Sequence, residues 1–222
     1  MAAMMFIATS LSAQKGGFKG TIKFENSYEG DIDAALLARM PKELEVQICG
    51  NFTKMSPYNG VTLLYNGNLK TSYTLFDFPM GSYYIATPKD STEAKRKNLK
   101  YDYEYTSETK TFAGYQCKKV LITVTDLETD EVTTQELWVS EEFNSNPDIN
   151  FSSFPGLKGY PLALTQSQKM PDGSEIVVKT QAVSVIENKK LKEQEFYLTT
   201  RYQKVTYEEL LKKLGVSGGN DD

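Results

Sequence analysis

The sequence predicts a mainly β (α+β) protein: a curved antiparallel sheet, or half-barrel, of roughly ten strands with one early helix and one C-terminal helix. Two observations carry this prediction. After Gly20, apolar residues recur mostly at every second position, which is typical of strands that bury one face. Turn signals such as Asn66-Gly67-Asn68 and Met170-Pro171-Asp172-Gly173-Ser174 separate the alternating segments and favour hairpins, hence antiparallel pairing.

The expected strands lie between these turn signals. They are residues 21–28, 43–55, 61–65, 69–76, 83–86, 101–106, 115–125, 132–140, 160–169 and 175–185. A sheet of this size usually curls or closes, because open edges invite pairing with other chains. Curvature is therefore part of the predicted fold.

Helix signals flank this series of strands. Asp31 or Asp33 can cap an Ala- and Leu-rich helix over residues 34–40, and Pro41 ends it. Residues 90–100 are polar and charged, and we expect a loop or a single helical turn there. Near the end of the chain, Thr206 and Glu209 fit a capping box and Gly215 fits a C-cap, so a terminal helix is expected.

The composition excludes several classes of function. The 222-residue chain has 25 Lys and Arg against 29 Asp and Glu, a net charge of −4, and no histidine. Without histidine there is no Ser-His-Asp or Cys-His nucleophile system, no His-ligated metal site and no His-based pH switch. The mild acidity argues against a nucleic-acid surface. We expect no enzyme activity, catalytic residue, cofactor or metal, because no phosphate loop or nucleophile elbow is present.

The first residues are typical of a secretory signal. Residues 1–13 are uncharged and apolar, and the small residues before Gln14 fit a cleavage site, although no Lys or Arg precedes them. We therefore expect a signal peptide with a truncated start over residues 1–14, one β-rich domain over 15–216 and a disordered tail over 217–222. A short buried N-terminal strand or helix is the alternative for the first segment. The expected location is the periplasm, the outer-membrane surface or the medium, without a transmembrane span.

The expected export affects how the two cysteines, Cys49 and Cys117, are interpreted. An even pair in an oxidising compartment could form a disulfide. The alternation places each cysteine on the face opposite to the aliphatic residues of its own strand. The two interpretations are a Cys49–Cys117 disulfide and two unpaired, half-buried thiols.

Several aromatic residues are candidates for lining a ligand pocket. Tyr101, Tyr103 and Tyr105 occupy alternate positions and so share one strand face. They fit either a pocket for an apolar or sugar ligand or ordinary cross-strand packing. Phe151 and Phe154 belong to a segment that is either a core crossing or a pocket rim. The full set of candidates is Phe76, Phe78, Tyr101, Tyr103, Tyr105, Trp138, Phe151 and Phe154.

Three strings resemble a known group of exported proteins. Residues 110–119 (KTFAGYQCKK) are similar to the K-x-I-x-G-Y-K-C-K-K string of small Gram-negative envelope proteins of unknown function related to the GLPGLI family. Residues 154–162 (FPGLKGYPL) resemble their G-x-P-L segment, and residues 202–210 resemble their Y-x-x-x-T-x-E-E-L ending. The resemblance covers roughly residues 18–214 and implies the architecture of LolA-like lipoprotein carriers, a curved half-barrel with helices on its concave side.

These observations together predict a non-enzymatic cell-envelope binding protein. Its concave sheet would hold a lipophilic ligand or a lipoprotein acyl chain in an apolar cavity of roughly 300–1,000 Å³. The alternative is a structural or adaptor protein of the periplasm or outer membrane, which binds an envelope protein through a surface or a sheet edge and holds no small ligand. The expected partners are accordingly a lipid or lipoprotein, or an envelope protein, and not a nucleic acid.

Overall fold

Twelve strands form one sheet in the computed structural model, which describes residues 17–58, 60–143, 154–169 and 173–215. The strands are β1 (Lys19–Gly30), β2 (Glu43–Cys49), β3 (Phe52–Tyr58), β4 (Val61–Asn66), β5 (Thr71–Phe78), β6 (Gly81–Pro88), β7 (Leu99–Phe112), β8 (Tyr115–Asp126), β9 (Val132–Ser140), β10 (Tyr160–Lys169), β11 (Glu175–Glu187) and β12 (Gln203–Lys204). Their order in the sheet is β12-β6-β5-β4-β3-β2-β1-β11-β10-β9-β8-β7. The predicted β class and curved antiparallel sheet are confirmed.

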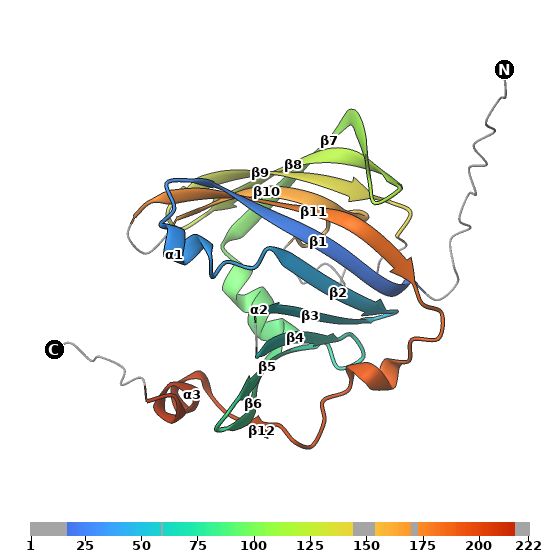
Figure 1. Ribbon diagram of the computed structural model, residues 1–222. Helices are drawn as coiled ribbons and strands as arrows, with labels where there is room; N and C mark the ends of the chain where they lie inside the picture. Colours follow the sequence, from blue (N-terminus) through green and yellow to red (C-terminus); the bar gives the residue numbers. More distant parts are fainter. Residues whose placement is uncertain (1–16, 59, 144–153, 170–172, 216–222) are drawn as a thin grey trace.

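The path of the chain leaves this sheet open. Strands β1 to β6 follow one another, and the helix α2 (Lys89–Arg96) then carries the chain to β7 at the opposite edge. From there β8 to β11 return, and β11 pairs with β1. Figure 1 shows the sheet curling around α2, with β7–β11 on one side and β3–β6 on the other. The pairing is antiparallel except between β12 and β6, which run parallel.

Local signals explain the turns and caps. The side-chain oxygen of Asn66 accepts hydrogen bonds from the backbone of Asn68 and Leu69, both at 3.1 Å. Only glycine fits at Gly67, because a Cβ there would lie 2.5 Å from the carbonyl oxygen of Asn51. Asp33 caps α1 (Ala34–Leu37) by accepting from two backbone amides.

The C-terminal helix α3 (Tyr207–Lys213) begins as the sequence predicts. Thr206 Oγ1 accepts from the backbone of Glu209 at 3.2 Å, and Glu209 Oε2 accepts from the backbone of Thr206 at 2.8 Å. This reciprocal capping box satisfies amides that would otherwise lack partners at the helix start. The helix buries Leu210 against Tyr83, so it is docked on the sheet.

The helix expected over residues 34–40 ends at Leu37, the strand expected over 101–106 extends over Leu99–Phe112, and three further segments differ in kind from the expectation. Residues 43–55 form two strands, because a tight turn lets Cys49 pair with Phe52 although the apolar alternation runs on. Residues 89–96 form the full helix α2. The chain after β11 also contains the 3₁₀ helix η2 (Glu193–Phe196) and strand β12, neither of which has a clear pattern in the sequence.

The disulfide interpretation is wrong: both thiols are free and wholly buried. Cys49 Sγ lies 3.5 Å from the carbonyl oxygen of Leu191, and Cys117 Sγ lies 3.7 Å from that of Tyr115. Each does sit opposite the aliphatic residues of its strand, since Cys49 and Val46 belong to different core clusters. The other interpretation, two unpaired thiols, agrees with the structure, except that both are fully buried: the chain covers the sheet on both faces, and the two thiols pack in different core clusters.

Candidate functional site

A segment after β11 crosses the sheet and forms a wall of a cleft (Figure 1). We call residues 188–202 the strap. Phe196, 1% exposed, anchors it: its ring lies 6.2 Å from that of Phe52, in a cluster with Leu64 and Leu75. Phe76, the neighbour of Leu75 in β5, belongs instead to the cluster under α3, because successive strand residues point to opposite faces. The strap and α3 therefore cover opposite faces of β5.

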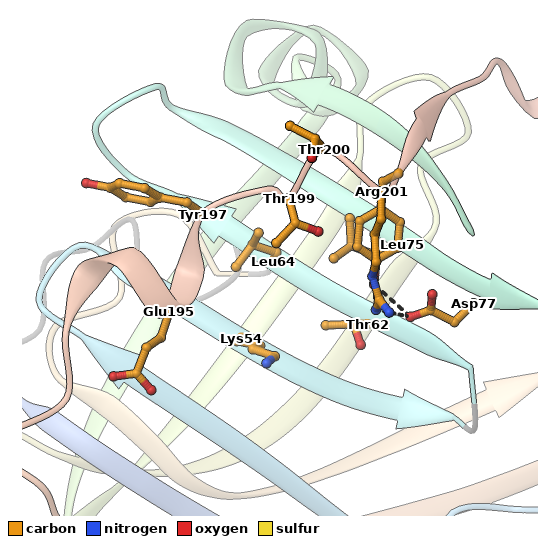
Figure 2. A pocket seen from close by; sticks show the side chains of 11 residues that line it. Lys54, Thr62, Leu64, Leu75, Asp77, Glu195, Tyr197, Thr199, Thr200 and Arg201 are labelled. Atoms are coloured by element: carbon orange, nitrogen blue, oxygen red, sulfur yellow. Dashed lines mark hydrogen bonds and ion pairs between the residues drawn. The ribbon is translucent and has the colours of Figure 1, made fainter. Parts of the chain in front are cut away.

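The strap cleft lies between this segment and strands β3–β5 and has a volume of about 430 Å³. Its floor includes the buried side chains of Leu64 and Leu75. Polar side chains of the sheet and the strap surround the floor, so the cleft combines an apolar base with a polar rim (Figure 2). Its lining residues are Lys54, Thr62, Leu64, Leu75, Asp77, Glu195, Tyr197, Thr199, Thr200, Arg201 and Tyr202.

A charged network ties one end of the strap to the sheet. Arg201 Nη2 donates to Asp77 Oδ2 at 2.9 Å, and the Tyr202 hydroxyl donates to the same oxygen at 2.7 Å. The Ser82 hydroxyl donates to Asp77 Oδ1 at 2.7 Å. The guanidinium of Arg201 also lies 4.6 Å from the centre of the Tyr202 ring, a cation–π contact. Figure 2 shows Arg201 reaching from the strap to Asp77.

This network sets the charge state of Asp77. Burial alone would raise the pKa of its carboxyl, but the hydrogen bonds from Tyr202 and Ser82 and the charge of Arg201 outweigh burial, so the pKa lies below its usual value of 3.8. Burial and the hydrogen bond to Asp77 raise the pKa of the Tyr202 hydroxyl. At neutral pH the network therefore contains a carboxylate, a guanidinium and a neutral phenol.

Lys54 supplies a second cation to the cleft. Its side chain is half-buried, and it has no ion-pair partner among the residues that the structure describes. Glu195 also lines the cleft, but its Oε1 accepts from the backbone amide of Lys192 at 3.1 Å within the strap. Lys54 is thus the side chain in the cleft that is placed to meet an acidic group of a ligand.

The aromatic candidates from the sequence lie elsewhere and pack against the chain itself. Tyr101 and Tyr103 join a cluster with Phe154, which is 9% exposed. The Tyr103 hydroxyl donates to the carbonyl oxygen of Pro155 at 2.7 Å, and burial raises the pKa of this hydroxyl. The Tyr105 hydroxyl accepts from the backbone amide of Lys158 at 2.8 Å. The segment around residues 154–158 thus covers the tyrosine face.

The remaining candidates are divided between two further clusters. Phe76 and Phe78 stack at 5.8 Å and are covered by α3. The Trp138 ring lies 5.9 Å from that of Phe112, and its Nε1 donates to Glu136 at 3.0 Å. Phe151 lies outside the described residues. None of the described aromatic candidates lines the strap cleft.

The sequence carried little signal for the residues that do line the cleft. Asp77 and Tyr202 are 125 positions apart, and the strap has no periodic apolar pattern. One available sign was that the polar residues Lys54, Thr62 and Asp77 fall on the same face of β3–β5 as Leu64 and Leu75. Which segment would cover that face depends on tertiary packing.

The described ranges contain no group of three or more His, Cys, Asp or Glu side chains that could hold a metal ion. Within the same ranges, no helix has both the length and the apolar content that crossing a bilayer requires.

Comparisons with known proteins define the fold and not the activity. No family model and no curated protein matches the chain, so the GLPGLI resemblance stays a prediction. Two solved structures of PNGF-II, in C2 and P21 space groups, match with TM-scores of 0.53 and 0.52 at 15% and 17% identity. They cover 89% and 88% of this chain but 33% of each PNGF-II chain, so this chain spans about a third of their length.

A LolA superfamily protein from Nitrosomonas europaea is a more distant structural neighbour. It has a TM-score of 0.35 and 10% identity over 84% of this chain and 93% of its own. At 15% and 17% identity the PNGF-II matches concern the fold alone, and the chemistry of the site must be argued from the residues themselves.

Proposed function

We propose that this chain is a non-enzymatic binding protein of the cell envelope and that it holds a lipophilic ligand with an anionic head in the strap cleft. The observation that carries the proposal is the pairing of an apolar floor, Leu64 and Leu75, with the half-buried Lys54 in one cleft of about 430 Å³. This volume falls in the range of roughly 300–1,000 Å³ typical of small-molecule sites.

The cleft replaces the concave aromatic face as the place for the ligand. None of the described aromatic candidates lines this cleft, whereas Leu64 and Leu75, although they also pack in the strap cluster, line its floor. In the strap cleft, an acyl chain would lie on Leu64 and Leu75. Its carboxylate or phosphate would meet the ammonium of Lys54, which gains a partner on binding.

The state of Asp77 supports binding rather than catalysis. A general acid or base works best with a pKa near the operating pH and with a free position for the substrate. Asp77 instead has a lowered pKa and accepts hydrogen bonds from three side chains. Its geometry is that of a structural acceptor which fixes the strap.

Location in the envelope belongs to the same proposal and rests on the first residues. Residues 1–13 are apolar and uncharged and precede a small-residue cleavage pattern. Fractionation of cells that express the chain should recover it in the periplasmic or membrane fraction, and N-terminal sequencing should begin near Lys15. Recovery of uncleaved protein in the cytosol would contradict this part of the proposal.

A fluorescent fatty acid, dansylaminoundecanoic acid, tests the site directly. The protein should enhance its emission with saturation, and dodecanoic acid should compete. Thr62→Trp fills the cleft from the sheet side and should abolish the signal. Lys54→Gln removes the charge that meets the carboxylate and should weaken binding by about tenfold or more, as expected for a hydrogen bond to a charged group.

Two matched controls separate the cleft from general effects. Thr133→Trp adds the same bulk at an exposed position of β9, and Lys42→Gln removes an exposed charge far from the cleft lining. Both controls should bind like the wild type. No binding by the wild type, or equal binding by the Thr62→Trp variant, would overturn the proposal. Native mass spectrometry of protein taken from its own envelope should also show a co-purified lipid.

An adaptor role is the second candidate, and one observation favours it. Strand β7 ends the sheet, and along its 14 residues no further strand pairs with it in the described part of the chain. Such an edge can accept a strand from a partner protein. If native mass spectrometry finds a bound envelope protein and no lipid, this second role gains support.

A further inference from the structure

A second surface feature lies where the strap leaves β11. Lys19 of β1 and Lys189, Lys190 and Lys192 of the strap line an open groove of about 530 Å³, together with Leu191, Glu193 and Gln194. We call the four lysines the lysine groove. Leu191 is buried in the strap cluster, and its carbonyl accepts from Cys49. This anchor fixes the backbone between the exposed lysines on either side of it.

The charge of this groove is unusual for the molecule. The whole chain carries −4, yet the groove gathers four lysines against one glutamate. None of the four lysines has an ion-pair partner among the described residues, whereas Lys118, Lys119 and Lys179 are paired. Mutual repulsion among unpaired cations is a cost to folding that an anionic partner would relieve.

The form of the groove favours phosphate groups at a membrane surface. The cations that line the groove are all lysines. A lysine ammonium acts as a point charge that can bind phosphate oxygens from many directions, whereas the planar guanidinium of arginine, which binds carboxylates with two parallel hydrogen bonds, is absent from the lining. Ile186 lies on β11 just before the strap and is 54% exposed. Two positions further on, the backbone amide of Asn188 donates to the carbonyl oxygen of Lys19, a residue of the groove. Cations beside an exposed apolar side chain are typical of surfaces that sit on anionic lipid.

We propose that the lysine groove docks this protein on the phosphate headgroups of an anionic bilayer. The inference extends the proposed function, since the same strap continues from the groove to the cleft. Glu193 and Gln194 line the groove, while Glu195 and Tyr197 line the cleft. Docking through the groove would hold the mouth of a lipid-binding cleft close to the membrane that supplies the ligand.

Vesicle sedimentation tests the docking. The wild type should sediment with dioleoyl-phosphatidylcholine vesicles that contain dioleoyl-phosphatidylglycerol and not with pure dioleoyl-phosphatidylcholine vesicles. Binding should vanish at roughly 1 M salt, where the screening length is about 3 Å. Lys189→Gln with Lys190→Gln should lower the partition coefficient about 30-fold, given the usual contribution of a lysine near an anionic surface.

A matched pair controls for charge. Lys42→Gln with Lys97→Gln also removes two exposed, unpaired lysines, at sites outside the groove, and it should sediment like the wild type. Equal loss in both double variants, equal binding to both vesicle types, or no sedimentation of the wild type would overturn the inference. Wild-type binding to polyglutamate beads without binding to vesicles would also overturn it and would indicate an acidic protein partner.

The cleft-filling variant Thr62→Trp separates this inference from the proposed function. It should still sediment with anionic vesicles although it no longer binds the fatty acid probe. If the wild type binds the probe in solution but ignores vesicles, the docking inference fails and the cleft proposal stands. If it binds vesicles but not the probe, the cleft proposal fails instead.

Discussion

The anchor of the strap gives the sharpest prediction about stability. Phe196 is 1% exposed and packs against Phe52 in the cluster that also contains Cys49, Leu64 and Leu75. Phe196→Ala removes most of a buried ring and leaves a cavity, which costs roughly 3–5 kcal/mol at comparable sites. For a domain of this size, the melting temperature should fall by roughly 6–20 °C, at about 2–4 °C for each kcal/mol.

Two assays report on this change at different places. Urea unfolding followed by fluorescence uses Trp138, the single tryptophan, which packs in the other large cluster beside Phe112. A thiol reagent (DTNB) added to the native protein reports on Cys49, which shares the strap cluster, and on Cys117, which does not. In the Phe196→Ala variant Cys49 should become reactive while Cys117 stays protected.

An exposed residue supplies the comparison. Tyr207→Ala removes a ring that is 65% exposed at the first turn of α3, and it should change stability by less than about 1 kcal/mol. If Phe196→Ala shifts the midpoint no more than Tyr207→Ala, or if both cysteines react together, then the strap is not anchored as described. The cleft of which it forms a wall would then lack a fixed shape.

Three further predictions follow from the same geometry. Burial raises the pKa of Cys117 to about 11, so the native wild type should react slowly with DTNB and release two thiols on unfolding without reductant, whereas a disulfide would release none. The pKa of Asp77 is lowered, so its contribution to stability is present at neutral pH and is lost as the pH falls below about 4. The difference in unfolding free energy between the wild type and Asp77→Asn should therefore shrink at acid pH. A difference that stays constant would contradict the hydrogen-bond network around Asp77. Gly159→Ala should destabilise the protein by about 1–3 kcal/mol in urea unfolding, since φ is +87° and the new Cβ would lie 2.7 Å from the carbonyl oxygen of Ser140. An unchanged unfolding free energy would refute this close approach. Gly156→Ala, where φ is similar but no atom lies near the new Cβ, separates the steric cost from the backbone strain.

The parts of the fold that the sequence predicts are those with local causes. The turn at Asn66-Gly67, the Asp33 cap and the Thr206 capping box each depend on contacts within a few residues, and each is present. The turn between β2 and β3 was missed because Phe52 is spaced in the sequence as if it continued the alternation of Val46 and Ile48, although it packs with Cys49 on the other face. The turn exchanges the two faces, since Cys49 pairs with Phe52 and Val46 with Met55, and the spacing of apolar residues alone does not reveal such an exchange.

The site could not be predicted for a different reason. A period of two tells which residues share a face, but it does not tell what covers that face. Cys49 shows this clearly: its face was identified correctly, yet the strap arrives there from residues 142 positions later and buries it. The shared face of Tyr101 and Tyr103 was likewise identified from the alternation, but the segment at Pro155 that covers it was not.

The open sheet explains why the strap is held at both ends. In a closed barrel β6 would pair with β7, but α2 lies between their two halves of the sheet and leaves both edges without that partner. The chain protects the β6 edge with β12, which directly follows the strap and pairs with Tyr83 and Tyr84. Phe196 anchors the strap within the cleft region and β12 fixes its far end. The segment between them is tied to the sheet by the bonds of Arg201 and Tyr202 to Asp77, so entry of the proposed ligand should be coupled to the integrity of that network.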